Sequence, residues 1–247
     1  MEEPSKLGID FIWNLVYNSN KLGQPKNERS YMNSNREDYL KVLYEEGGLE
    51  KPVSNKIISS RLDIAPGSVT EMLTKLSDAG LVEYIAYKGS KLTEKGLSIC
   101  SNLIRSHRLW EVFLMRHLNY SWREAHEEAH RLEHVATNRM VDRLDKFLDY
   151  PEVCPHGESI PKKGEYLTVK HGIIPLSDFG EGESCMISKI VEDGDLLDYA
   201  QSIGLQIGEE IQIISKGAYE GPIEFNQGGK KITMSYKAAT QIFVEKV

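Results

Sequence analysis

The sequence predicts an α+β chain of several domains: a winged helix-turn-helix towards the N-terminus, a helical domain, and a small β-rich domain at the end. Two observations support this. Two helical patterns separated by a Pro-Gly turn at 66–67 precede a short basic hairpin pattern, and prolines and glycines after Tyr150 separate a His- and Glu-rich stretch from short β-like runs. With 247 residues the chain is long enough to build two or three small cores.

Composition limits the kinds of partner. The formal net charge of −7 excludes a uniformly basic nucleic-acid coat and a polybasic membrane anchor, so any nucleic-acid site must be a local patch. Three scattered cysteines cannot form a disulfide framework, which predicts a reducing compartment, the cytoplasm. The acidic start and the lack of a long apolar run predict neither a secretion signal nor a membrane segment.

The first part of the chain has the order expected for a winged helix-turn-helix over residues 34–105. Residues 1–33, rich in asparagine, are expected to form a flexible extension. A first helix starts near Glu37 and stops at Gly47-Gly48, a second is introduced by Ser54, and a third is expected to open at Ser68. A hairpin over 81–92, turning at 88–90, supplies the wing.

The third of these helices is the candidate for DNA reading. In a helix-turn-helix this helix enters the major groove, while basic residues of the wing contact phosphates. The candidate residues are Ser68, Thr70, Glu71 and Lys75 on the helix and Lys88 and Lys91 on the wing. Residues 54–108 carry a net charge of +3 and the remainder −10, as local phosphate binding by an acidic protein requires. The alternative is a winged helix used only for protein contacts.

Residues 106–158 predict a helical domain that binds a metal ion. Five of the seven histidines lie between His107 and His134. Helical spacing places His107 with Glu111 on one face, and His126, His130, Glu133 and His134 on another. Cys154 and His156 follow. Imidazole, carboxylate and thiolate donors suit Mn, Fe(II), Co, Ni or Zn better than Ca or Mg.

Two other interpretations of these residues remain. The His and Glu side chains could be structural, in which case DNA binding would not need metal. Residues 126–130 also match the H-E-x-x-H pattern of zinc proteases, with Glu127 as the base. Nothing resembles a substrate-cleft strand, and Cys154 and His156 would fill the open coordination position that a hydrolase needs, so we expect no enzyme.

From about Ser34 onwards the chain resembles the diphtheria-toxin-repressor family of metal-dependent repressors. The motifs are E-D-Y-L at 37–40, S-V-T-E-M at 68–72, L-T-E-K-G at 92–96, H-R-L-W-E at 107–111, H-E-E-A-H-x-x-E-H at 126–134 and C-P-H-G at 154–157. Residues 159–247 resemble the SH3-like, FeoA-type β-barrel of its manganese-sensing branch. The resemblance implies a homodimer on a palindromic DNA operator near metal-uptake genes, with a helical metal-binding and dimerisation domain and no small-molecule substrate.

The resemblance also implies two metal sites. One uses Glu111, Cys154 and His156, with His107 and His126 close by and Glu192 or Asp193 from the third domain. The other joins Asp38 to His130, Glu133 and His134. The chain has Lys41 where shorter family members have Glu, and His130 where others have Glu or Cys. The oxygen ligand Asp38 favours Mn(II) over the alternative Fe(II), and Zn(II), Co(II) or Ni(II) could substitute in vitro.

Overall fold

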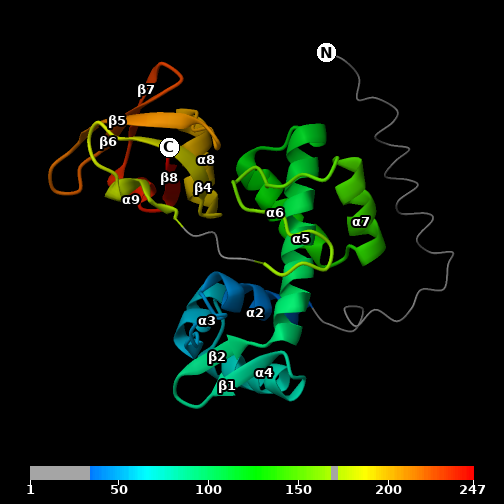
Figure 1. The fold of residues 1–247 in the computed structure, drawn as a ribbon. Helices are drawn as coiled ribbons and strands as arrows, with labels where there is room; N and C mark the ends of the chain where they lie inside the picture. Colours follow the sequence, from blue (N-terminus) through cyan, green and yellow to red (C-terminus); the bar gives the residue numbers. More distant parts are fainter. Residues whose placement is uncertain (1–33, 168–171) are drawn as a thin grey trace. The chain divides into compact units, whose positions relative to one another are not determined.

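The computed structural model describes residues 34–167 and 172–247 (Figure 1). These residues form two compact units. Unit 1 contains the described residues up to His107 together with 131–147 and 161–167. Unit 2 contains 108–130, 148–160 and the described part of 168–247. The expected extension over 1–33 lies outside the described residues.

Unit 1 begins with the winged helix-turn-helix. Its helices are α2 (Ser34–Glu45), α3 (Asn55–Leu62) and α4 (Pro66–Asp78). The Ser54 side chain caps α3 by accepting from Ile57 N. The prediction that α4 opens at Ser68 is wrong by two residues, because Pro66 has no N–H to leave unpaired and fits the first helical position. Apolar faces of the three helices share one core, which includes Leu40, Ile58 and Leu73.

The wing consists of β1 (Val82–Ile85) and β2 (Gly89–Leu92), paired antiparallel. Its turn covers 86–88, whereas the sequence predicts a turn at 88–90. Gly89 is needed in the strand: its φ is +117°, and a Cβ there would lie 2.0 Å from the Val53 carbonyl oxygen. Val53 also pairs with Ser90 as an isolated bridge, so the wing is held against the residues that precede α3.

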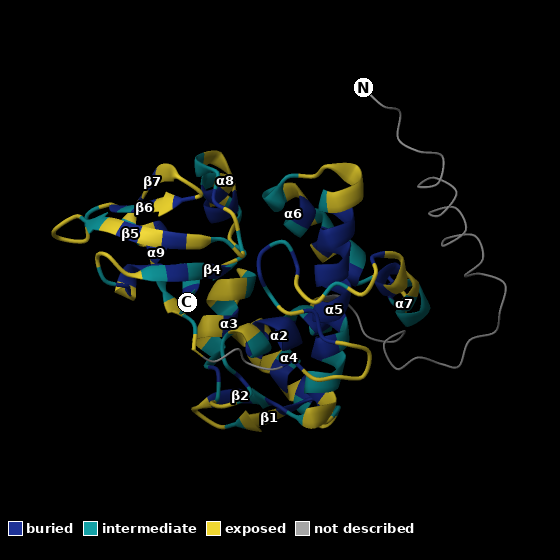
Figure 2. Cartoon of the chain, turned by 45° about the horizontal axis from the view of Figure 1, so that its top comes forward, coloured by how far each residue is buried: buried dark blue, intermediate teal, exposed yellow. Residues whose placement is uncertain are grey.

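The predicted helical region over 93–150 contains three helices, α5 (Glu94–Leu118), α6 (Trp122–Glu133) and α7 (Asn138–Phe147). Residues 103–114 of α5 are all buried, which Figure 2 shows as a nearly continuous buried stretch. A helix buried on every side must pair its charged residues. In unit 1, Arg105 does so by donating to Asp142 at 3.1 Å and to Asp145 at 2.7 Å.

Unit 2 contains a six-stranded antiparallel sheet in the order β3-β8-β4-β5-β6-β7. The strands are β3 (Ile174–Pro175), β4 (Ser184–Ile190), β5 (Glu210–Lys216), β6 (Ile223–Gln227), β7 (Lys230–Met234) and β8 (Ile242–Lys246). The short 3₁₀ turn η3 (Leu176–Asp178) and the helices α8 (Gly194–Ile203) and α9 (Tyr236–Ala239) accompany it. Alternate apolar residues such as Ile211 and Ile213 face one core, as in an SH3-like β-barrel.

Among the described helices, none combines the length and the apolar character needed to cross a bilayer.

Candidate metal centres and nucleic-acid interface

Unit 2 brings four potential ligands together, which we call the thiol cluster: Glu111, Cys154, His156 and Glu192. One donor atom from each lies within 4.8 Å of the others. Glu111 and His156 are fully buried, and His156 Nδ1 lies 3.1 Å from Glu111 Oε1 and 3.8 Å from Glu192 Oε1. The ligands come from α5, from the loop at 154–157 and from Glu192, two residues before α8, so residues far apart in sequence meet here.

The loop that carries Cys154 and His156 is fixed by backbone bonds. Gly157 N donates to Cys154 O at 3.0 Å, and Ile190 N, at the end of β4, donates to His156 O at 3.1 Å. Gly157 adopts φ +88°, and a Cβ there would lie 2.0 Å from Ser188 O. Only glycine therefore allows this loop to approach β4 so closely.

The electrostatics of the thiol cluster favour a cation. Burial, together with the negative charges of Glu111 and Glu192, raises the pKa of the Cys154 thiol well above its usual value. Arg108 opposes this effect, but it also pairs with Glu158 at 3.3 Å. The fully buried carboxylate of Glu111, beside a buried thiol and the partly exposed Glu192, is costly without a cation. A divalent transition-metal ion would supply that charge and displace the thiol proton.

His126 lies beside the two carboxylates of this cluster. His126 Nδ1 lies 3.2 Å from Glu111 Oε1 and 3.7 Å from Glu192 Oε2. Of the two third-domain candidates, Glu192 faces the cluster, whereas Asp193 caps α8 by accepting from Leu196 N at 3.0 Å. The Trp122 ring stands edge-on to His156, with centroids 5.8 Å apart.

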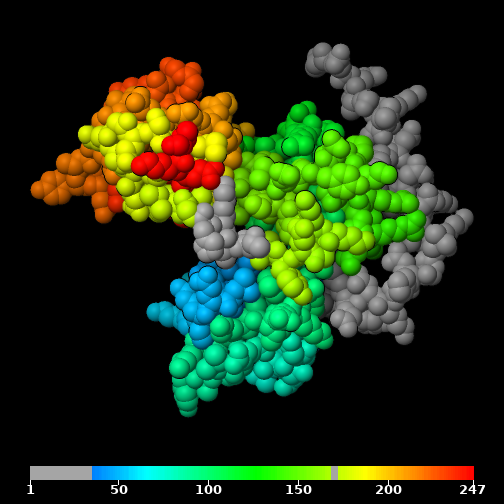
Figure 3. All heavy atoms as spheres, in the orientation of Figure 1, coloured from blue at the N-terminus to red at the C-terminus, as the bar shows by residue number. Residues whose placement is uncertain are grey.

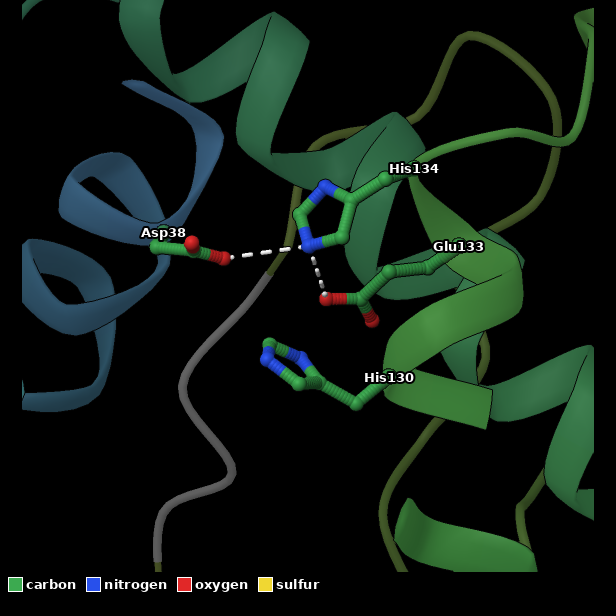
Figure 4. A group of neighbouring side chains, drawn as sticks. All are labelled: Asp38, His130, Glu133 and His134. Atoms are coloured by element: carbon green, nitrogen blue, oxygen red, sulfur yellow. Dashed lines mark ion pairs between the residues drawn. The ribbon is translucent and has the colours of Figure 1, made fainter. Parts of the chain in front are cut away.

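The second group, the α2 cluster, consists of Asp38, Glu133 and His134, with His130 one turn earlier on α6 (Figure 4). His134 Nε2 lies 3.1 Å from Asp38 Oδ1 and 3.4 Å from Glu133 Oε1. Asp38 belongs to α2 of the helix-turn-helix, and Glu133 and His134 belong to the end of α6 and the residue after it. A divalent ion held by these donors would join the two helices.

His134 is oriented by a residue that the sequence did not single out. Its Nδ1 atom lies 2.7 Å from the buried carboxylate of Glu37, which leaves Nε2 facing Asp38 and Glu133. Such a carboxylate behind an imidazole is typical of metal-binding histidines. Burial opposes the charged imidazolium, but bonds to Asp38 and Glu37 and the charge of Glu133 outweigh it and raise the pKa of His134 to about 9.

Lys41 and His107 lie on the other side of Glu133. The Lys41 Nζ donates to both Glu133 oxygens, at 3.3 and 3.1 Å, and His107 Nδ1 lies 2.6 Å from Glu133 Oε2. The sequence groups His107 with Glu111, which follows one turn later on α5; the structure also places its Nδ1 against Glu133. The spacing of Glu37 and Lys41, four residues apart, could have indicated that both share one face of α2.

The candidate DNA-reading residues lie on the surface of α4. Ser68, Thr70, Glu71 and Lys75 are all exposed, while Val69, Leu73 and Leu76 on the opposite face are buried. Asn55 Nδ2, at the start of α3, donates to Thr70 Oγ1 at 3.1 Å, and Lys75 Nζ donates to Glu71 at 2.6 Å. The helix thus presents a polar face that a major groove can accept.

The wing presents a lysine and two tyrosine rings at the surface. Lys88 is exposed in the turn, whereas Lys91 lies within β2 opposite Glu83, away from the tip. Tyr87, which the sequence analysis did not single out, is fully exposed at φ +64°, and with Tyr84 it lines a surface hollow of about 470 Å³. Figure 3 shows the hairpin tip projecting from the surface at the lower edge of the view.

A winged helix-turn-helix linked to two groups of metal-type ligands defines a class of protein, the metal-responsive DNA-binding regulators. Family models agree with this class: "Iron dependent repressor, N-terminal DNA binding domain" matches residues 32–90, "Iron dependent repressor, metal binding and dimerisation domain" matches 93–162, and "FeoA domain" matches 174–246.

Full-length relatives agree as well. The chain is 40% identical to ScaR, solved with bound Zn²⁺, over 86% of this chain and all of that one (TM-score 0.74). It is 38% identical to the manganese regulator SloR over 87% of this chain and all of that one (TM-score 0.71). The diphtheria toxin repressor of Corynebacterium glutamicum is 26% identical over 85% of this chain and 96% of its own length. The chain belongs to the diphtheria-toxin-repressor family and is a metal-dependent DNA-binding repressor.

Proposed function

We propose that the protein is a Mn(II)-responsive repressor of metal-uptake genes, with Fe(II) as the alternative effector, acting in the cytoplasm. The observation that carries this proposal is the meeting of Asp38, from a helix of the DNA-binding domain, with Glu133 and His134. A ligand that binds both helices changes how the DNA-binding domain is held, which is what a metal-dependent repressor requires.

A bound divalent ion would supply positive charge shared among Asp38, Glu133 and His134, with His130 one turn away. The chain does the rest. Leu40 and Leu43 of α2 belong to the same core as Ile58 of α3 and Leu73 of α4, so holding Asp38 also restrains the reading helix. Glu37 keeps the His134 ring in the orientation that directs Nε2 towards Asp38.

The proposed preference for Mn(II) follows from the donors. Asp38 and Glu133 offer hard carboxylate oxygens, which match a hard ion. ScaR is described as manganese-activated and SloR as a manganese regulator, and both are similar to this chain over their whole length. The thiol cluster would also accept Zn(II), Co(II) or Ni(II) in vitro, because Cys154 and His156 suit softer ions.

We further propose that a homodimer reads a palindromic operator. A two-fold dimer presents its recognition helices about 34 Å apart, one turn of DNA, or a multiple of this. The apolar residues expected to pack the dimer are Leu132, Val135, Ala136, Met140, Leu144 and Phe147. Ala136 and Leu144 are buried within the chain, so packing inside one copy already uses them, whereas Val135 and Phe147 are exposed.

Gel shifts with metal added and removed test this proposal. The probe is duplex DNA selected from a random library by the purified protein in Mn(II). We expect the selection to enrich an inverted repeat. EDTA should weaken DNA binding by at least about 100-fold, since a complete switch between mostly inactive and mostly active states corresponds to roughly 10⁴-fold. Binding that survives EDTA unchanged would favour the metal-independent regulator instead.

The H-E-x-x-H alternative receives no support from the geometry. Glu127, the residue that would act as base, is exposed and accepts from Arg123 Nε at 2.9 Å. A casein cleavage assay with Zn(II) checks this point, and we expect no cleavage.

A further inference from the structure

Lys41 is a buried cation in the middle of a proposed metal site. Lys41 is only 9% exposed, and its ammonium group contacts the fully buried Glu133. Burying an ammonium group and a carboxylate costs free energy unless the two groups form an ion pair. The positive charge of Lys41 therefore offsets part of the negative charge of the α2 cluster.

The two oxygens of the Glu133 carboxylate face different groups of side chains. Its Oε1 atom lies 3.4 Å from His134 Nε2, on the side of Asp38. Its Oε2 atom lies 2.6 Å from His107 Nδ1 and 3.1 Å from the Lys41 ammonium group. A carboxylate between two sets of donors could bridge two ions, one on each side. In this chain a lysine already lies on the second side.

The charge of Lys41 contributes to the balance of charge in this cluster. Three carboxylates, Glu37, Asp38 and Glu133, converge on this cluster. One divalent ion and the Lys41 ammonium group together carry three positive charges, the same number as the negative charges of the three carboxylates. A second divalent ion would leave an excess of two positive charges in a largely buried site, which is unfavourable at low dielectric.

We propose that Lys41 is a built-in cation that takes the place of a second divalent ion and limits the α2 cluster to one. This inference rests on the proposed metal site. It assigns Lys41 a role in determining metal stoichiometry and affinity, because its ammonium group holds both Glu133 oxygens and repels an incoming ion.

The experiment compares Mn(II) binding by full-length wild type, Lys41→Glu, Lys41→Gln and Lys41→Arg, by equilibrium dialysis and electron paramagnetic resonance. Lys41→Glu replaces the cation by a fourth carboxylate, so we expect one additional Mn(II) per chain, with a signal broadened by the neighbouring ion. Lys41→Gln should keep the wild-type number of ions and bind Mn(II) about tenfold more tightly, since a nearby positive charge is lost. Lys41→Arg should behave as wild type.

Matched controls are Lys146→Glu and Lys146→Gln, at an exposed lysine on α7, which should change neither number nor affinity. If circular dichroism shows that Lys41→Glu does not fold, the Lys41→Gln affinity decides. The inference is overturned if Lys41→Glu folds but binds the wild-type number of ions, or if Lys41→Gln binds no more tightly than wild type. The proposed metal site itself would be wrong if Asp38→Ala bound as much Mn(II) as wild type. That result is distinct from a failure of the inference about Lys41.

Discussion

The two ligand groups differ in what they connect and in how they are balanced. The thiol cluster draws its ligands from α5, the 154–157 loop and Glu192, and it combines a thiol with two carboxylates. The α2 cluster includes a residue of the DNA-binding domain, holds a lysine beside Glu133, and has a partly accessible His134. We propose that similar donors serve different purposes here: the first group would hold an ion that stabilises unit 2, and the second would bind an ion that acts as a signal.

The largest expected effect comes from Glu133→Ala. It removes a proposed ligand and leaves the buried Lys41 without this carboxylate, so metal-dependent DNA binding should fall by roughly 100-fold. Gel shifts in Mn(II) measure it. The control is Glu128→Ala on the same helix, which should bind as wild type; equal losses in both variants would contradict the assignment.

Cys154→Ser tests the other group. Replacing the thiol should weaken Co(II) or Zn(II) binding by roughly 10- to 100-fold and abolish the near-ultraviolet band of a Co(II)–thiolate bond, because a hydroxyl is a poor ligand for these ions. Absorbance titration of the purified protein measures both, with Cys185→Ser in the sheet domain as control. A band that persists in Cys154→Ser would show that another cysteine binds the metal.

Acid should weaken the α2 cluster through His134. The pKa of His134 is raised to about 9 in the metal-free protein, so below that pH an ion must displace its proton. Mn(II) affinity should therefore fall as pH falls, by up to about tenfold per unit from this one proton. Titrations between pH 6 and 8 measure it, and a flat profile would contradict the role of His134. Glu37→Gln, which removes one of the groups that raises this pKa, should give a shallower slope.

The smallest effect is expected from Arg123→Ala. Arg123 of α6 donates to Asp195 and Asp198 of α8 at 3.1 and 2.9 Å and packs against Gly194, close to Glu192. Loss of these exposed pairs should weaken metal binding at the thiol cluster by only about threefold. Arg139→Ala on α7 is the control. A loss as large as that of Glu192→Ala would mean that the position of Glu192 depends on Arg123.

Much of the fold could be predicted from local patterns. Spacing of apolar residues and the Ser54 cap predict α3, and Gly47-Gly48 predicts the end of α2 near the position observed. Two boundaries differ from those that local patterns predict: Pro66 starts α4 two residues earlier, and the wing turns at 86–88 because Gly89 is needed in β2 beside Val53. A close backbone contact between distant segments leaves no periodic signal in the sequence.

Residue types and their spacing are enough to indicate which chemistry is available: the density of His and Glu on α5 and α6, Cys154 with His156, and a candidate reading helix followed by a basic hairpin. Helical periodicity is enough for that, because it places residues three and four apart on one face. Which side chains meet depends on the packing of segments that are far apart in the chain. This packing selected Glu192 over Asp193, placed Glu37 behind His134, and brought Lys41 to Glu133 across 92 positions of sequence. Packing brings such charged side chains together, and once they are buried the free energy of each charge depends on the charges beside it.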